Sequence, residues 1–315
     1  MSYQIGEKVA TREAYGKALV EFGADENIIV MDADLSKSTK TEGFKKAYPE
    51  RFINTGIAEG NMMSVAAGIS TCGKTVFASS FAMFAAGRAF EQIRNSIGYP
   101  HLNVKIGATH AGISVGEDGA THQCLEDIGI MRTIPGMVIL NPADATESRL
   151  AVKAAIEHKG PVYLRFGRLA VPTIFDDNYK FEIGKGVQIS DGTDVTIIAT
   201  GLMVPEAIKA AEILQPDGIS ARVINMATIK PIDKDIIIKA AKETGAIVTA
   251  EEHNVMGGLG SAVAEVLCES VPVPMLRVGT NDVFGRSGKP YALLDMYGLN
   301  AENIAANAKK AIALK

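Results

Sequence analysis

The stretch that decides the fold is IIVMDAD, residues 28–34, an apolar run that turns acidic at its end. A continuous apolar run of this kind is typical of a strand that is buried on both faces of a parallel sheet. Residues 11–23, which precede it, carry apolar side chains at helical spacing and end at a glycine, so they predict a helix. Asp32 and Asp34 are therefore expected at or just after the carboxyl end of a buried strand, where α/β sheets bind their ligands.

The alternation of helix and strand patterns continues beyond residue 34 and predicts an α/β protein. Further strands are expected at KTVFAS (74–79), NVKIGAT (103–109), MVILNP (137–142) and PVYLRF (161–166), and helices at 61–71, 81–97 and 145–158. The rhythm breaks at residues 171–186, where a proline, paired aspartates and isolated apolar residues indicate a linker.

The alternation restarts after this linker. Strands are expected at VTIIATG (195–201), ARVINM (221–226), AIVTAEEH (246–253) and MLRVG (275–279), and helices at 205–214, 234–242, 259–267 and 301–315. The segment MGGLG (256–260) matches no nucleotide-binding fingerprint and predicts a tight turn between strand and helix. We therefore predict two domains, residues 1–170 and 187–315, each a mostly parallel sheet flanked by helices.

Composition excludes several classes of protein. Of the 315 residues, 47% are hydrophobic, and 32 basic and 36 acidic residues give a net charge of −4, which argues against disorder and against nucleic-acid binding. No apolar run reaches the roughly 18 residues of a membrane span, and the N-terminus lacks the apolar core of a secretion signal. Cys72, Cys124 and Cys268 are far apart and form no metal-spaced pair, so we expect a reduced, cytoplasmic protein.

The segment GIAEGNM (56–62) places Glu59 between an extended segment and an apolar helix. The ordinary interpretation is a carboxylate that the helix dipole stabilises. The functional interpretation is a buried acid that holds or shares a proton. The residue by itself leaves both open.

Residues 108–123, ATHAGISVGEDGATHQ, bring two histidines and two acids together among glycines. No helical or strand period fits them, so we expect a long loop, and long ordered loops in compact domains are often functional. The spacing of His110 and His122 matches no zinc pattern, and Cys124 adds none. Imidazoles beside glycines favour recognition of a polar, hydroxylated ligand over a simple tight turn.

Arginines follow one of the expected strands. In LRFGR (164–168), Arg165 and Arg168 are either solvated surface or a clamp for a phosphate group. Arg12 and Ser38 could serve in the same way.

Two phenylalanines stand three residues apart in SFAMF (80–84). Phe81 and Phe84 predict the core face of a helix, or else a pair of rings around a flat cofactor.

These segments in this order resemble the transketolase family of thiamine diphosphate enzymes. The combination of GEDG-x-THQ with GIAE-x-NM is highly specific, whereas every other block is weak. Those other blocks are ATR (10–12), ADLSKST (33–39), SFAMF, NPAD (141–144), the arginine-bearing strand end, TIKPID (228–233), AEEH (250–253) and FGRSGKPYALL (284–294). The resemblance covers nearly the whole chain and implies a pyrimidine-binding domain followed by a transketolase C-terminal domain.

The resemblance implies cofactor roles for four residues. Glu59 matches the glutamate that hydrogen-bonds the pyrimidine ring nitrogen of thiamine diphosphate and takes part in activating it. Phe81 and Phe84 match the aromatic pocket around the pyrimidine, and Asp34 matches an acid close to the cofactor.

The resemblance also implies substrate roles. His110 and His122 match catalytic histidines that contact the carbonyl and hydroxyl groups of the substrate, and Asp118 matches an acid that reads a sugar hydroxyl. The groups that match the holders of the sugar phosphate are Arg12, Ser38 and Arg168, with Arg165 as a less certain contact.

Two positions depart from the family pattern. Gly60 stands where many members have histidine or glutamine, and Gly87 stands where some members place a third aromatic ring. Both are expected to loosen the pocket without removing the central acid.

The larger departure is the absence of a GDG motif from the sequence. The family binds magnesium and the diphosphate through GDG and a downstream asparagine, so Mg²⁺ is expected to be held by another chain. We therefore predict the C-terminal subunit of a split transketolase, inactive alone and assembled with an N-terminal partner as α2β2. The predicted reaction transfers a two-carbon ketol unit from a ketose phosphate to an aldose phosphate.

Three alternatives are weighed against this prediction. A deoxyxylulose-phosphate synthase usually has arginine where His110 stands, and the GEDGATHQ segment argues against the beta subunit of a 2-oxo-acid dehydrogenase. A non-catalytic scaffold subunit would not need Glu59, His110, His122 and Arg168 together.

Overall fold

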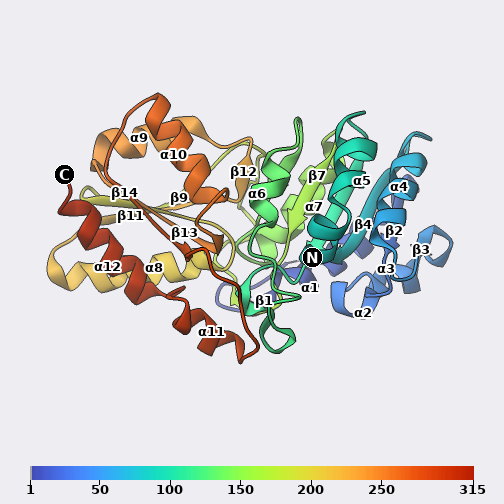
Figure 1. Ribbon diagram of the computed structural model, residues 1–315, viewed down its shortest axis with the longest axis horizontal. Helices are drawn as coiled ribbons and strands as arrows, with labels where there is room; N and C mark the ends of the chain where they lie inside the picture. The colour runs from blue at the N-terminus through green and yellow to red at the C-terminus, as the bar shows by residue number, and fades with distance from the viewer. Residues whose placement is uncertain (1) are drawn as a thin grey trace.

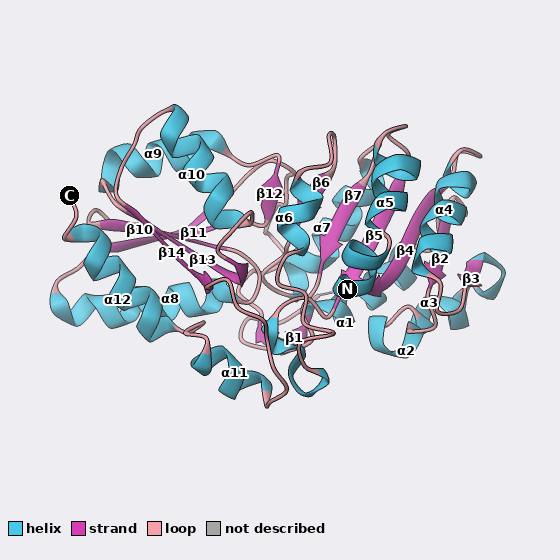
Figure 2. Cartoon of the chain, in the orientation of Figure 1, coloured by secondary structure: helices cyan, strands magenta, loops and turns pink. Residues whose placement is uncertain are grey.

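The computed structural model describes residues 2–315. It confirms the predicted α/β class, because two mostly parallel sheets lie side by side and helices cover their faces (Figures 1 and 2). No helix between residues 2 and 315 is both long and apolar enough to cross a bilayer.

The first sheet has seven strands, in the order β12-β6-β7-β5-β4-β2-β3. IIVMD forms β2, and all neighbouring pairs from β6 to β3 are parallel. The strands are β2 (Ile28–Asp32), β3 (Phe52–Asn54), β4 (Thr75–Phe81), β5 (Val104–Thr109), β6 (Val138–Leu140), β7 (Val162–Arg165) and β12 (Thr228–Lys230). The last of these comes from the C-terminal half of the chain and pairs antiparallel with β6.

Helices cover both faces of this sheet. They are α1 (Thr11–Phe22), α2 (Ser36–Thr39), α3 (Glu42–Ala47), α4 (Glu59–Ser70), α5 (Phe90–Gln92), α6 (Asp127–Arg132) and α7 (Ala145–Glu157). One core lies beneath α1 and α7 and holds large rings such as Tyr15, Phe77 and Phe166. The opposite core beneath α4 is built mainly from alanine, methionine and isoleucine.

The single helix predicted at 81–97 is wrong in detail. Phe81 ends β4, and the helical segment after it contains two π-helical turns, Met83–Arg88 and Ile93–Gly98, on either side of α5. Such wide turns are rare and often occur at functional sites, where they re-aim side chains.

The second sheet has the order β14-β13-β10-β11-β9, with β9 antiparallel to β11. Its strands are β9 (Val187–Ser190), β10 (Val195–Ala199), β11 (Ala221–Asn225), β13 (Ile247–Asn254) and β14 (Met275–Thr280). Its helices are α8 (Met203–Leu214), α9 (Lys234–Thr244), α10 (Leu259–Glu269), α11 (Pro290–Met296) and α12 (Ala301–Ile312). The segment MGGLG forms the expected turn, because Gly257 has φ 80° and α10 begins at Leu259.

The segment between the two sheets is attached to the first of them. Strand β8 (Ala170–Pro172) pairs antiparallel with β1 (Lys8–Ala10), and the buried carboxylate of Asp144 accepts hydrogen bonds from the backbone of Ile174 and Phe175. Phe181 and Ile183 then pack against the core beneath α1 and α7.

Candidate active site

The candidate site lies where the parallel strands of the first sheet end. The register pairs Phe81 of β4 with Thr109 of β5, and Ala108 of β5 with Arg165 of β7, so their carboxyl ends meet at one edge. His110 follows β5 directly and has φ 56°, an uncommon backbone conformation for a side chain other than glycine or asparagine. The loops that leave this edge therefore begin at neighbouring positions.

Four rings gather at this edge. The Phe81 ring stacks on the imidazole of His110 with centroids 3.8 Å apart, and on Phe84 at 5.8 Å and an interplanar angle of 12°. The imidazole of His122 meets Phe84 edge-on at 5.2 Å. The predicted aromatic pair is therefore present, but Phe81 reaches it from the end of a strand rather than from a helix face.

Glu59 is the first residue of α4, and its side chain is 1% exposed. Its carboxylate accepts a hydrogen bond of 3.4 Å from the Ser80 hydroxyl and one of 2.7 Å from Nη1 of Arg88. The guanidinium of Arg88 also lies 4.8 Å from the centre of the Phe84 ring. The acid is thus buried beside the aromatic pair, as the functional interpretation of Glu59 requires.

Sequence reasoning missed Arg88 and Ser80. Neither belongs to a pattern that singles it out, because their role depends on how β4 and the first π turn face α4. The Arg88 side chain is 52% exposed, so its guanidinium can leave Glu59 for water without a large desolvation penalty.

A cationic corner adjoins the rings. Nη1 of Arg12, in the first turn of α1, donates a 2.7 Å hydrogen bond to the backbone oxygen of Ser38 and lies 3.4 Å from Nε2 of His110. Burial and the nearby charge of Arg168 lower the pKa of Arg12. The structure therefore brings together Arg12, Ser38, His110 and Arg168, the residues expected to bind a phosphorylated substrate.

Arg168 also ties down the loop expected at residues 108–123. Its Nη1 donates to the backbone oxygen of Val115 and, at 2.9 Å, to the carboxylate of Glu117. The middle of this loop, Ile113–Asp118, is a 3₁₀ turn that is kinked at Gly116. The sequence here has no regular period and therefore does not indicate this turn.

Arg165 is not a phosphate contact, and that interpretation is wrong. Its side chain is 3% exposed, pairs with Asp127 at 2.8 Å and donates to the backbone oxygen of Glu252 at 3.0 Å. The guanidinium is therefore committed to a buried ion pair at the junction of the two sheets.

The two remaining acids, Asp34 and Asp118, lie on the surface of the molecule. Asp34 is exposed with φ 66° and exchanges two hydrogen bonds, of 3.0 and 3.1 Å, with the side chain of Asn54. Asp118 is exposed at the end of the 3₁₀ turn, four residues before His122.

The two glycines that depart from the family pattern have neighbours that fill their space. A Cβ at Gly87 would come within 2.6 Å of Cε of Met83, and one at Gly60 within 3.1 Å of Oε1 of Gln92. A flexible side chain therefore takes up part of the space beside each glycine.

Burial governs the protonation state of His110. Burial, together with the charges of Arg12, Arg168 and Lys40, lowers the pKa of His110 to about 3. Nδ1 of the imidazole lies 2.9 Å from Oγ1 of Thr109. The ring is therefore neutral near pH 7 and can serve as a hydrogen-bonding group rather than as a cation.

We expect NMR of imidazole-labelled protein to show His110 neutral down to pH 5. Because the pKa of His110 is lower in the folded chain than in the unfolded chain, the unfolded chain binds more protons between about pH 6.5 and 3, and His110 makes stability fall as the pH drops through that window. His101, for comparison, lies outside the cluster. Titration of His110 near pH 6.5 would contradict the burial argument.

The residues fit one half of a thiamine diphosphate site. A buried carboxylate beside two nearly parallel rings suits an aromatic ring with a basic nitrogen, and Glu59, Phe81 and Phe84 would hold it. In the described residues, no group of three or more histidine, cysteine, aspartate or glutamate side chains could hold a metal ion.

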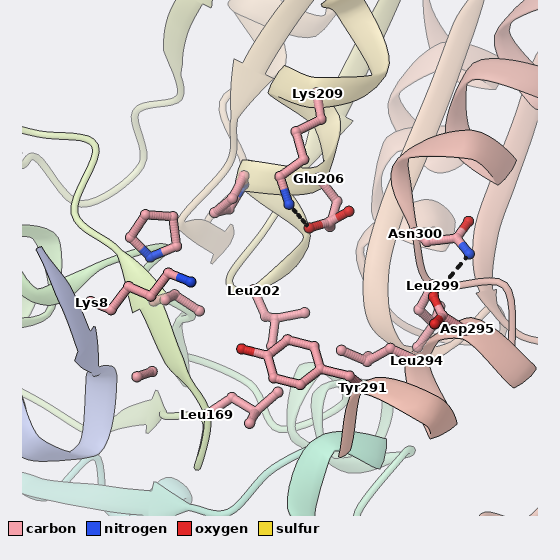
Figure 3. Close-up of a pocket in the computed structure, with 14 residues that line it drawn as sticks. Lys8, Leu169, Leu202, Glu206, Lys209, Tyr291, Leu294, Asp295, Leu299 and Asn300 are labelled. Carbon is pink, nitrogen blue, oxygen red and sulfur yellow. Dashed lines mark hydrogen bonds and ion pairs between the residues drawn. The ribbon is translucent and has the colours of Figure 1, made fainter. Parts of the chain in front are cut away.

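A cavity of about 270 Å³, separate from the candidate site, lies between the β1–β8 ribbon and helices α8 and α11. Figure 3 shows the Lys209–Glu206 ion pair on one wall and Tyr291, Leu294 and Asp295 of α11 on another. None of the predicted site residues lines this cavity.

Comparison with known proteins agrees with this geometry. The family model of the transketolase pyrimidine binding domain matches residues 7–173, and that of the transketolase C-terminal domain matches residues 184–304. A protein of Methanocaldococcus jannaschii whose name describes it as a transketolase C-terminal section is 55% identical over 298 residues, which cover 93% of each chain. The 6-deoxy-6-sulfo-D-fructose transketolase subunit SqwH of Clostridium sp. (strain MSTE9) is 43% identical over 94% of this chain and 92% of its own.

A solved structure of a split-gene transketolase, an inactive β4 tetramer, superimposes with a TM-score of 0.91 and 57% identity. The match covers 98% of this chain and 99% of that one. The chain therefore belongs to the transketolase family, in which it comprises the pyrimidine-binding domain and the C-terminal domain.

Proposed function

We propose that this chain is the C-terminal subunit of a two-subunit transketolase that moves a two-carbon ketol unit from a ketose phosphate to an aldose phosphate. The observation that carries the proposal is the buried Glu59 beside Phe81 and Phe84, within one cluster that also holds His110 and Arg12. Binding of a flat cofactor and a phosphorylated sugar requires an acid, an aromatic pair, a neutral imidazole and guanidinium groups.

Each residue has a stated task in this proposal. Glu59 holds a proton at the pyrimidine nitrogen of thiamine diphosphate, and Phe81 and Phe84 orient the ring. Thiamine diphosphate, when bound here, would supply carbanion chemistry toward a carbonyl group. In this proposal Asp34 is an acid close to the cofactor.

In the same proposal, a second set of residues binds the substrate. His110, whose imidazole is neutral, and His122 hydrogen-bond the carbonyl and hydroxyl groups of the sugar, and Asp118 reads a further hydroxyl. Arg12, Ser38 and Arg168 bind the phosphate, since guanidinium groups remain charged and offer paired donors.

The partner follows from the missing half of the site. Mg²⁺ needs oxygen ligands, which the family provides through a GDG motif that also binds the diphosphate. This sequence contains no GDG motif. We therefore infer an N-terminal transketolase subunit that carries GDG and a downstream asparagine, in an α2β2 assembly with two composite sites. The name of the relative SqwH specifies 6-deoxy-6-sulfo-D-fructose, so relatives of this similarity can differ in the sugar on which they act. An assay with several sugar phosphates identifies the donor and the acceptor.

Gentle affinity purification of the chain from its own cells, followed by mass spectrometry, tests this proposal. We expect an equimolar partner with GDG and a downstream asparagine, and ketol transfer between sugar phosphates only when both chains, thiamine diphosphate and Mg²⁺ are present. Co-elution of a lipoyl-bearing protein would instead support a 2-oxo-acid dehydrogenase. Ketol transfer by the purified chain alone would contradict the composite site.

A further inference from the structure

The loop that carries Asp118 and His122 is built against the C-terminal domain. Gly112, Gly116 and Gly119 have φ values of 87°, 85° and 77°, which strongly favour glycine. A Cβ at Gly112 would collide with the carboxylate of Glu252, and one at Gly119 would lie 2.5 Å from Oγ of Ser287. At Gly116 it would lie 2.8 Å from Cγ of Pro290. All three glycines therefore allow the loop to approach residues that follow the linker.

One buried carboxylate of the C-terminal domain holds this loop directly. Glu252, in β13, is 3% exposed, and its Oε1 accepts a 2.7 Å hydrogen bond from the backbone N–H of Ser114. Ser114 is itself fully buried in the 3₁₀ turn. A buried N–H without an acceptor is costly, so this bond fixes the position of the turn.

A second contact joins a side chain of the loop to the backbone of the C-terminal domain. Nε2 of Gln123, at the end of the loop, lies within hydrogen-bonding distance of the backbone oxygens of Ile113 (3.1 Å), Gly116 (3.2 Å) and Arg286 (2.9 Å). Arg286 belongs to the segment between β14 and α11, and a Cβ at Gly285 would collide with the Gln123 side chain. The amide group thus joins the start and the middle of the 3₁₀ turn to the C-terminal domain.

Helix α11 completes the support. It packs against the 3₁₀ turn through its first residue, Pro290, while Tyr291 and Leu294 line the cavity on the β1–β8 side (Figure 3). From the other side, Arg168 donates to Val115 and Glu117 of the same turn. The loop is therefore clamped between the first sheet and the C-terminal domain.

We propose that the C-terminal domain positions the loop at residues 108–123, which we call the substrate loop. Glu252 is a positioning residue that holds Ser114 and thereby sets the placement of Asp118 and His122. Glu252 touches no substrate in this account; it acts through the backbone of the turn. The statement about substrate rests on the proposed function, whereas the statement about loop order concerns this chain alone.

Hydrogen exchange of the full chain tests the tie itself. In Glu252→Ala, we expect the amide of Ser114 to exchange about tenfold faster or more, as for a buried N–H that has lost its acceptor. Glu252→Gln keeps an acceptor oxygen and is expected to restore most of the protection. Unchanged protection of Ser114 in Glu252→Ala would overturn the proposal.

Glu251→Ala is the matched control. Glu251 lies on the same strand, is 1% exposed and accepts from the backbone of Leu259 and Gly260 instead, at 2.7 and 2.8 Å. This variant is expected to raise exchange at the start of α10 and to leave Ser114 protected. An equal rise at Ser114 in both variants would mean general loosening of the domain and would also overturn the proposal.

Kinetics in the complex with the N-terminal partner test the consequence. Glu252→Ala is expected to raise KM for the sugar phosphate and to lower kcat/KM about tenfold, with unchanged affinity for thiamine diphosphate and with rescue by Glu252→Gln. A fall in cofactor affinity with unchanged KM would refute the positioning role. Absence of ketol transfer in the wild-type complex would refute the proposed function, while the exchange result would still decide whether the domain holds the loop.

Discussion

Replacement of Glu59 by glutamine is expected to reduce ketol transfer by the assembled enzyme by about two to four orders of magnitude, the usual contribution of a positioned acid or base. Glutamine keeps the size of the side chain and one acceptor oxygen for Ser80 and Arg88. It could not hold or release the proton that Glu59, in the proposed reaction, shares with the pyrimidine nitrogen of the cofactor. The measurement is the rate of transfer between sugar phosphates at saturating thiamine diphosphate, with both subunits present.

Glu91→Gln provides the control for this experiment. Glu91 lies in α5, is exposed, and hydrogen-bonds the side chains of Gln92 and Asn95. This variant is expected to retain the wild-type rate and to co-purify with the partner as Glu59→Gln does. If the Glu59→Gln enzyme were fully active, Glu59 would not take part in the chemistry, and this result would favour a non-catalytic scaffold subunit.

Removal of the carboxylate of Asp127 is expected to lower the free energy of unfolding by about 3–5 kcal/mol, the range found when one partner of a buried ion pair is lost. Both Asp127 and Arg165 are buried, and Asp127 Oδ2 also accepts a 2.9 Å hydrogen bond from the Tyr163 hydroxyl. In Asp127→Ala, the guanidinium of Arg165 would remain in the interior without its counter-charge. Urea unfolding followed by circular dichroism measures the difference.

The double variant Asp127→Leu with Arg165→Met separates charge from packing. Since it removes both partners of the ion pair, it is expected to be more stable than Asp127→Ala. If Asp127→Ala unfolded at the wild-type urea concentration, the ion pair would contribute nothing to the junction of the two sheets.

Long, strongly patterned segments of the fold could be predicted from sequence. IIVMDAD, NVKIGAT and AIVTAEEH form buried strands where their apolar runs place them, because hydrophobic periodicity records burial directly. Short strands such as β8 and β12 were not predicted, since three residues carry too little pattern and their pairing partners are distant in the chain. Residues 81–97 carry a helical pattern, which cannot distinguish π turns from an α-helix.

The candidate site likewise contains residues that could be predicted from the sequence and residues that could not. Glu59, His110 and Arg12, which all belong to segments that resemble the family, lie together in the structure. Arg165 and Arg168 look alike in sequence, yet Arg165 is buried against Asp127 whereas Arg168 holds the loop at residues 108–123. Only the tertiary fold determines which of these two side chains is buried. Arg88 belongs to no motif, and its contact with Glu59 became visible only in three dimensions.

Strand β12 bears on how the molecule can be dissected. Thr228–Lys230, well beyond the segment that separates the two sheets, covers the outer side of β6 in the first sheet. A fragment ending before residue 187 would therefore expose the unpaired N–H and C=O groups of a buried apolar strand, and such edges recruit other chains. The N-terminal half alone is consequently a template for aggregation, and the two halves form one unit of folding that proteolytic trimming or domain exchange with a relative has to respect.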